Sequence, residues 1–147
     1  MMRVPISLVG EIKEYMSFQG FKLPLYSGTV QAGYPTAAGD HVEDKIDLTE
    51  HLVRKPSDTF LVRAAGESMI DAGIQDGDLL IVDRSIAPVN GKVVIAAVDG
   101  QLTVKFLIIK KGKPFLMPAN AEFAPIPVDP ENGVLIWGVV TNSIHAH

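Results

Sequence analysis

The sequence predicts a mostly β fold: a small antiparallel β-rich domain preceded by an extended N-terminal arm. Thirteen glycines and ten prolines in 147 residues indicate many turns, which favours short strands over a helical bundle. Apolar residues make up 47% of the chain and charged residues 20%, as is typical of a folded globular protein. Turn residues separate apolar runs regularly only in the later part of the chain. We therefore expect an arm over residues 1–40 and a β domain over residues 41–147.

The arm contains one segment with helical potential, residues 8–16, which is long enough for two turns. In the domain, residues 49–55 predict a short helix that stops at Pro56. Residues 68–73 predict a helical turn, which the turn-forming residues 75–78 follow. Apolar runs between turn residues predict strands over residues 59–65, 79–82, 92–98, 101–109, 115–117 and 134–141.

Asp99-Gly100 lies between two of these predicted strands. This dipeptide is preferred in the type I′ turns of two-residue β-hairpins. We therefore expect residues 92–98 and 101–109 to pair as neighbouring antiparallel strands.

The composition excludes several kinds of site. The chain has no cysteine, so disulfides, thiolate metal sites and a cysteine nucleophile are excluded. The four histidines show no metal-ligand spacing with nearby acids, and we expect neither a metal nor another cofactor. The terminal His145-Ala146-His147 is interpreted as a frayed tail.

Charge and hydropathy indicate which kinds of partner and which cellular compartment to expect. The net charge is −4 with no basic cluster, which predicts no strong direct binding to DNA, because phosphate contacts need concentrated Lys and Arg. The apolar runs are too short to span a membrane, and the first residues lack the apolar stretch of a signal peptide. We expect a cytoplasmic protein.

Ser68 is the first candidate for chemistry. It lies in Gly66-Glu67-Ser68-Met69-Ile70, after an apolar strand and at the start of the possible helical turn. A serine there can be exposed at a sharp bend, beside backbone N–H groups that stabilise an oxyanion. The alternative is a helix N-cap serine, which is far commoner and is favoured by the local sequence alone.

Lys105 favours the interpretation of Ser68 as a reactive residue over that of a helix cap. In the strand over residues 101–109, alternation places Leu107 and Ile109 on the same face as Lys105. These apolar neighbours predict a partly desolvated amine with a lowered pKa, and a neutral lysine can accept the proton of a serine hydroxyl. The alternative is a strand lysine that reaches water. A Ser-His-Asp triad built from Ser68, His41 and an aspartate has no support in the sequence.

Two stretches together resemble the LexA/UmuD family of self-cleaving serine peptidases: AAGESMIDAGIQDGDLLIVD, residues 64–83, and GKVVIAAVDGQLTVKFL, residues 91–107. The match combines a G-x-S-M segment, a D-G-D-L strand entry, and a lysine in a hairpin strand. The segments VQAGYP, residues 30–35, and VEDKIDL, residues 42–48, place the resemblance in the UmuD branch. It covers roughly residues 25–141.

The resemblance implies a role for each site residue. Ser68 would be the nucleophile and Lys105 the general base, and the backbone N–H groups of Glu67 and Ser68 would form the oxyanion hole. The cleaved bond would join Ala32 to Gly33, where glycine permits the bend that a substrate needs to enter a cleft of its own domain. Without the resemblance, Ala32-Gly33 is better interpreted as an ordinary loop.

The resemblance also implies partners and a role. Members of the family form homodimers and cleave themselves when stimulated by a RecA filament on single-stranded DNA. In the UmuD branch, the trimmed dimer joins an error-prone catalytic polymerase subunit (UmuC-like) in SOS-induced translesion synthesis.

Three alternatives remain open. The peptidase half of a LexA-like or phage repressor would need a helix-turn-helix ahead of the cleavage site, for which about 32 interrupted residues are too few. A signal-peptidase relative with the same dyad would need a membrane anchor. In a non-enzymatic binding module, Ser68 and Lys105 would be structural.

Overall fold

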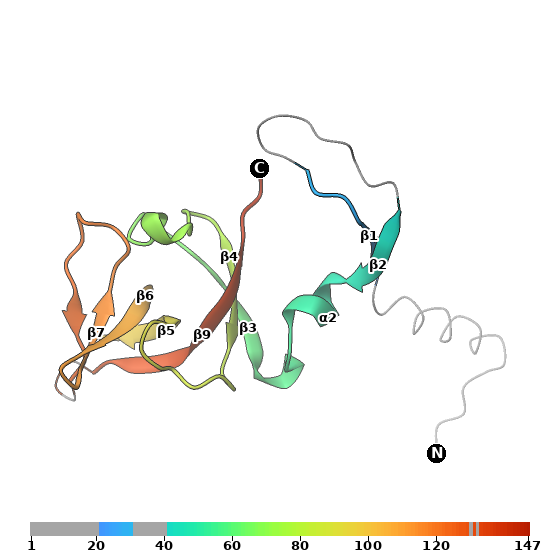
Figure 1. The fold of residues 1–147 in the computed structure, drawn as a ribbon. Coiled ribbons are helices and arrows are strands. Elements are labelled where there is room, and N and C mark those ends of the chain that lie inside the picture. The colour runs from blue at the N-terminus through green and yellow to red at the C-terminus, as the bar shows by residue number, and fades with distance from the viewer. Residues whose placement is uncertain (1–20, 31–40, 130, 132) are drawn as a thin grey trace, which may run out of the picture. The chain divides into compact units, whose positions relative to one another are not determined.

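The computed structural model of the chain describes residues 21–30, 41–129, 131 and 133–147 (Figure 1). It divides into two compact units, the first ending at Leu52 and the second running from Val53 to His147. Residues 41–52 thus group with the preceding segment. The predicted boundary at residue 40 separates an arm from a peptidase domain. A division into compact units does not test that boundary, which stays a prediction. The helix expected over residues 8–16 lies outside the described residues.

The first unit contains a two-stranded sheet that the sequence did not predict. Strand β1 (Lys22–Tyr26) pairs antiparallel with β2 (Val42–Asp47). The short helix α2 (Leu48–Leu52) follows directly. It begins where the Asp47 carboxylate accepts the N–H groups of Thr49 and Glu50, which is how an aspartate caps a helix N-terminus. The predicted short helix is therefore present, although it ends at residue 52 instead of 55.

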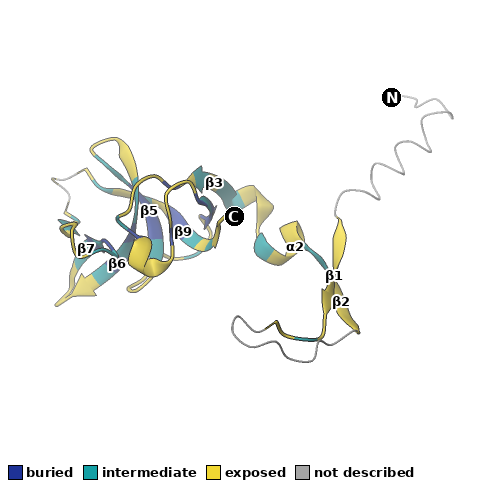
Figure 2. Cartoon of the chain, turned by 90° about the horizontal axis from the view of Figure 1, so that it is seen from above, coloured by how far each residue is buried: buried dark blue, intermediate teal, exposed yellow. Residues whose placement is uncertain are grey.

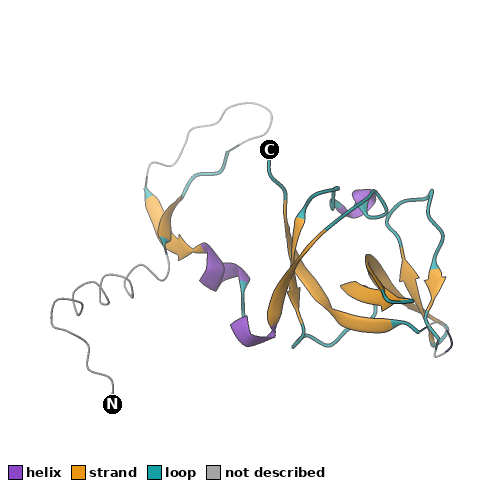
Figure 3. Cartoon of the chain, turned by 180° about the vertical axis from the view of Figure 1, so that it is seen from behind, coloured by secondary structure: helices purple, strands orange, loops and turns teal. Residues whose placement is uncertain are grey.

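The second unit is built on one antiparallel sheet of seven strands, in the order β3-β4-β9-β5-β6-β7-β8. Two 3₁₀ turns, η1 (Pro56–Asp58) and η2 (Ile70–Ala72), flank β3. Strands are the dominant regular structure of this unit, as Figure 3 shows, so the predicted mostly β, antiparallel class is confirmed. The strands are β3 (Thr59–Arg63), β4 (Leu79–Asp83), β5 (Val93–Val98), β6 (Gln101–Lys110), β7 (Lys113–Met117), β8 (Ile126–Pro127) and β9 (Leu135–Ile144).

The hairpin of β5 and β6 forms as predicted. Asp99 and Gly100 both have positive φ angles, 49° and 79°, as the two central residues of a type I′ turn require. Val98 pairs with Gln101 directly across this turn, and the same register sets Lys105 opposite Val94. The position of Lys105 is thus fixed by the hairpin.

The core consists of two clusters of buried apolar side chains, and β5 contributes to both. Ile95 belongs to the first cluster, whereas its neighbours Val94 and Ala96 belong to the second. This division follows from the alternation of side chains along a strand. Figure 2 shows β5 as one of the most buried strands. Met69, which directly follows Ser68, is 2% exposed in the first cluster and anchors the segment before η2.

Strand β9 joins the two halves of the sheet by pairing with β5 through its first half and with β4 through its second. The register shifts once in each pairing, and irregularities of this kind bend a strand and increase its twist. Gly138 lies at the bend. A Cβ there would lie 2.8 Å from Val82 Cγ1 and 3.3 Å from the Asp83 carbonyl oxygen, so the close approach of β9 to β4 depends on glycine.

We therefore expect Gly138→Ala to lower the free energy of unfolding by about 1–3 kcal/mol, the usual cost of overpacking a core. Urea denaturation would measure this change in the free energy of unfolding. Ser143→Ala, at an exposed position of the same strand, should change stability far less. Equal stability of Gly138→Ala and the wild type would contradict the packing argument.

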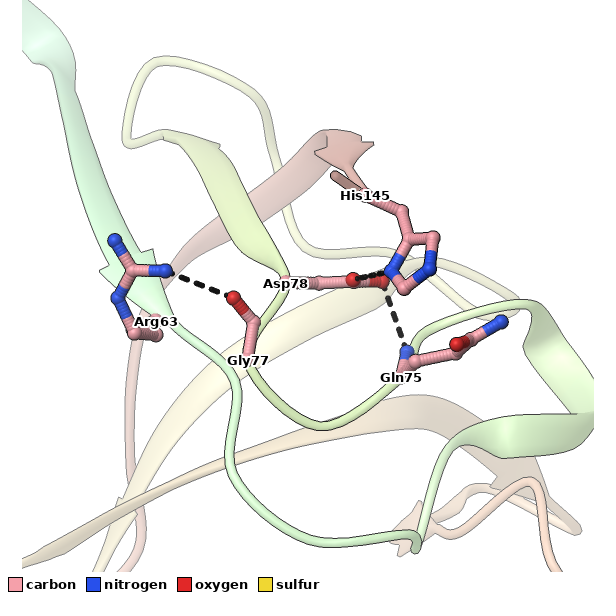
Figure 4. Close-up of polar contacts among 5 residues, drawn as sticks. All are labelled: Arg63, Gln75, Gly77, Asp78 and His145. Atoms are coloured by element: carbon pink, nitrogen blue, oxygen red, sulfur yellow. Dashed lines mark hydrogen bonds and ion pairs between the residues drawn. The ribbon is translucent and has the colours of Figure 1, made fainter. Parts of the chain in front are cut away.

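A buried carboxylate ties the end of β9 to the start of β4 (Figure 4). Asp78 is 1% exposed. One of its oxygens accepts the Gln75 N–H at 2.9 Å, and the other lies 2.5 Å from His145 Nδ1. The hydrogen bond from Gln75, aided by that with His145, lowers the pKa of Asp78 although burial opposes the shift. His145 is thus held against the sheet, which differs from the frayed tail that the sequence suggested.

This lowered pKa predicts a dependence of stability on pH. When folding lowers the pKa of a carboxyl group, its ionised form stabilises the protein at pH values above its pKa in the unfolded chain, here 3.8. That contribution is lost as the pH falls through the pKa in the folded protein. Asp78→Asn should therefore lower the free energy of unfolding near pH 7, and the difference from the wild type should shrink below pH 3.8.

Denaturant titrations between pH 7 and pH 2 would measure this difference. Asp99→Asn is a matched control, because asparagine suits a left-handed turn position as well as aspartate does. A gap between Asp78→Asn and the wild type that stays constant over the whole range would rule out the ionised carboxylate as its cause.

Candidate active site

Hydrogen bonds hold the residues that precede Ser68 in its loop. The Ala64 N–H donates to the Asp78 carbonyl oxygen, and the Gly77 N–H donates to the Ala64 carbonyl oxygen, both at 2.8 Å. The Asp76 carboxylate then accepts the Gly66 N–H at 2.7 Å. Gly66 has a φ of +87°, a left-handed conformation that glycine adopts without steric cost. The D-G-D segment noted in the sequence therefore braces the serine loop.

The side chains of Ser68 and Lys105 are in contact, although the two residues are 37 positions apart in the sequence. Lys105 Nζ lies 2.9 Å from Ser68 Oγ. The N-cap residue of η2 is Met69, and no side chain caps this turn, so the interpretation of Ser68 as a helix cap is not supported. The serine hydroxyl instead faces an amine at hydrogen-bond distance.

Lys105 is buried, with 7% of its surface exposed, so it does not reach water as a surface lysine would. Its amine contacts two further groups, Thr103 Oγ1 at 2.6 Å and the Val104 carbonyl oxygen at 3.1 Å. Among the described residues, no carboxylate lies within ion-pair distance of the amine. Desolvation of the amine lowers the pKa of Lys105, as its apolar strand neighbours predicted.

Two backbone N–H groups at the serine are available as hydrogen-bond donors. Within the described part of the chain, no hydrogen bond engages the N–H of Glu67 or of Ser68. The carbonyl oxygens of the same two residues are occupied, since Asn120 Nδ2 donates to Glu67 at 2.9 Å and the Ala119 N–H donates to Ser68 at 2.8 Å. Two fixed N–H groups next to a nucleophile are what an oxyanion hole requires.

A cavity of about 260 Å³ lies beside the serine. Most of the side chains around it are small or apolar, so it suits an uncharged segment with small side chains. The lining residues are Val62, Arg63, Ala64, Ala65, Ser68, Leu80, Ile95, Leu102, Thr103 and Val104.

The structure leaves one part of the predicted site undescribed. Ala32 and Gly33, the expected cleavage point, lie outside the described residues, so the cleavage site stays a prediction. Across residues 21–30, 41–129, 131 and 133–147, no group of three or more His, Cys, Asp or Glu residues could hold a metal ion. The same ranges contain no helix that is both long and apolar enough to cross a membrane.

Two polar residues at the site were not identified as functional from the sequence. Thr103 precedes Lys105 by two positions, so strand alternation already placed both on one face, but nothing marked its hydroxyl as a partner of the amine. Asn120 lies 52 residues from Ser68 in the sequence, two positions after the buried Pro118. No local pattern predicts that it contacts the serine loop.

Comparison with known proteins identifies the family to which the chain is related. Residues 24–141 match the model of the Peptidase S24-like family. The chain is 41% identical over 126 residues to Protein MucA of Salmonella typhimurium, covering 85% of this chain and 86% of MucA. It is 44% identical over 122 residues to Protein ImpA of Shigella flexneri, covering 83% of each chain. Protein SamA of Salmonella typhimurium is 41% identical over 122 residues, covering 83% of this chain and 84% of SamA.

The family match extends over almost the same residues as the resemblance seen in the sequence motifs, and it includes both Ser68 and Lys105. The identities are spread over more than four fifths of each relative. The predicted relationship to the self-cleaving LexA/UmuD peptidases is therefore confirmed: the chain belongs to the Peptidase S24-like family.

Proposed function

We propose that this chain is a UmuD-like accessory subunit of an SOS-induced, error-prone DNA polymerase, activated when it cleaves itself between Ala32 and Gly33. The observation that carries the peptidase part is the 2.9 Å contact between Lys105 Nζ and Ser68 Oγ in a desolvated setting. The role in the polymerase rests on the similarity to MucA, ImpA and SamA.

The three polar contacts of Lys105 suit a neutral amine that acts as a base. Such an amine has two N–H groups and one lone pair. The Val104 carbonyl oxygen only accepts, so it takes one N–H, and the Thr103 hydroxyl oxygen accepts the other. The lone pair is then left for the proton of the Ser68 hydroxyl. Thr103 and Val104 would thus orient the base.

The reaction follows from this arrangement. Lys105 accepts the hydroxyl proton as Ser68 Oγ attacks the carbonyl carbon of Ala32, and the N–H groups of Glu67 and Ser68 stabilise the negative oxygen that forms. The bond to Gly33 breaks, and its nitrogen takes the proton from Lys105. Water, deprotonated by the same amine, then hydrolyses the ester at Ser68 and returns the site to its starting state.

The sheet offers a place for the substrate segment beside the serine. Strand β6 pairs with β5 from Gln101 onward but with β7 only from Phe106 onward. In the described sheet, Gln101 to Lys105 therefore have a strand partner on one side only. An extended segment could pair with this free edge, which leads past Thr103 and Lys105 to the cavity at Ser68.

The remaining parts of the proposal concern partners. A cytoplasmic homodimer would associate with a RecA filament before cleavage and with a polymerase catalytic subunit afterwards. The net charge of −4 supports recruitment through these proteins, because an acidic chain without a basic cluster has little affinity for DNA phosphates.

The first test of the proposal is the pH dependence of self-cleavage. The rate should rise with pH as Lys105 loses its proton, and it should level off at a pH below the ordinary lysine value of 10.5, because burial lowers the pKa of this amine. Mass spectrometry of protein incubated over a pH series should find one fragment that ends at Ala32 and one that begins at Gly33.

Ser68→Ala and Lys105→Ala should both abolish this cleavage at every pH, since one removes the nucleophile and the other the base. Lys92→Ala, an exposed lysine of the same hairpin, is the matched control and should cleave at the wild-type rate. Cleavage that persists in Ser68→Ala and Lys105→Ala would refute the dyad. Fragments with other ends would refute the site.

The second test concerns Thr103. Thr103→Val keeps the shape of the side chain but removes the hydroxyl that holds the amine, so self-cleavage should slow roughly tenfold or more, as expected when a reacting group loses its alignment. Thr103→Ser keeps the hydroxyl and should stay near the wild-type rate. A slow Thr103→Ser together with a fast Thr103→Val would mean that the methyl group, and not the hydroxyl, matters.

A further inference from the structure

A short segment from a distant part of the sequence lies along the serine loop. The Ala119 N–H donates to the Ser68 carbonyl oxygen at 2.8 Å, and the Asp71 N–H donates back to the Ala119 carbonyl oxygen at 2.9 Å. Asn120 adds a side-chain contact, since its Nδ2 donates to the Glu67 carbonyl oxygen at 2.9 Å. The loop is therefore held on the side of its carbonyl groups.

Holding a carbonyl group also directs the N–H group of the same peptide. The Glu67 carbonyl and the Ser68 N–H belong to one planar trans peptide unit, in which they point in opposite directions. A donor that fixes the Glu67 oxygen on one side therefore aims the Ser68 N–H to the other. That N–H is one of the two donors assigned above to the oxyanion hole.

Asn120 is itself well placed to act as such an anchor. Its Oδ1 accepts the Glu122 N–H at 3.0 Å, and its carbonyl oxygen accepts the Phe123 N–H at 3.1 Å. The bond from Glu122 identifies Oδ1, so the amide nitrogen is the end that faces Glu67. The other donor to the Glu67 oxygen, the Ile70 N–H, is longer at 3.3 Å, so Asn120 supplies the closer contact.

The contact has an electronic effect as well as a geometric one. A hydrogen bond to the oxygen of a peptide polarises that peptide and strengthens its N–H as a donor. Donors that are already aligned before the reaction stabilise an oxyanion without reorganisation at the moment of attack. A side chain behind the peptide can therefore affect the rate without touching the substrate.

We propose that Asn120 is a positioning residue for self-cleavage, which acts by anchoring the Glu67–Ser68 peptide so that the Ser68 N–H points at the forming oxyanion. This inference rests on the proposed self-cleavage. It assigns Asn120 to the oxyanion hole and not to the Ser68/Lys105 dyad, and this distinction makes it testable by pH dependence.

The test compares self-cleavage of Asn120→Ala and Asn120→Asp with the wild type over a pH series. Asn120→Asp keeps the oxygen that accepts the Glu122 N–H but loses the donor to Glu67, so it separates the anchor from the turn. Both variants should cleave at least about tenfold more slowly at every pH, a loss in the range seen when supporting residues behind a reactive group are removed. For Asn120→Ala, which introduces no charge, the pH at which the rate is half maximal should not move, because Lys105 is unchanged.

Asn90→Ala is the matched control, since the Asn90 amide oxygen likewise caps a backbone N–H, that of Ile109 at 2.7 Å. It should cleave within twofold of the wild type. Circular dichroism should show that Asn120→Asp, which retains the turn bond, is folded like the wild type.

Three outcomes would be decisive against the inference or against its basis. Asn120→Asp within twofold of the wild-type rate would overturn the inference. A lower rate of Asn120→Ala accompanied by a shifted half-maximal pH would also overturn it, because Asn120 would then act through Lys105. Failure of the wild type to cleave at any pH would instead remove the proposed function on which the inference rests.

Discussion

The site depends on one physical constraint, the burial of the Lys105 amine. A charged amine is costly to remove from water unless an opposite charge accompanies it, and none of the described carboxylates does so. The fold meets this constraint by supplying polar groups that a neutral amine satisfies: a carbonyl, a threonine hydroxyl and the serine hydroxyl. The features that bury the lysine, namely its place in β6 and its buried neighbour Leu107, are thus the same features that favour the neutral amine which the proposed base requires.

The second requirement is a rigid loop opposite that amine. Three separate segments meet the serine loop: the D-G-D turn at Asp76 and Asp78, the core through Met69, and the segment at Ala119 and Asn120. None of these contacts involves the substrate. The loop is therefore held by contacts that do not depend on a bound segment, which is the condition under which fixed dipoles are most effective in catalysis.

The sequence predicted those features that have a local signal. Strand alternation identified the apolar face around Lys105, and Asp99-Gly100 identified the hairpin, because both depend on residues within a few positions of each other. The pairing of β1 with β2 was missed, since β2 carries Glu43, Asp44 and Lys45 in succession and shows no apolar alternation. Asn120 was missed for a different reason. Its contact with the serine loop depends on where the chain runs in space after β7, and no spacing within the sequence encodes that position.

The two-residue turn between β5 and β6 has a consequence for which changes of length the chain tolerates. Exposed hairpin turns usually tolerate insertions and deletions, because they lie outside the core. Here Val98 pairs with Gln101 across the turn, and Lys105 follows only four residues later. One added or lost residue, unless a bulge absorbed it, would turn every following side chain to the opposite face. The side chain of Lys105 would then point away from Ser68, and the contact between them would be lost. An exposed loop of this protein is thus as sensitive to a change of length as its core is to a change of volume.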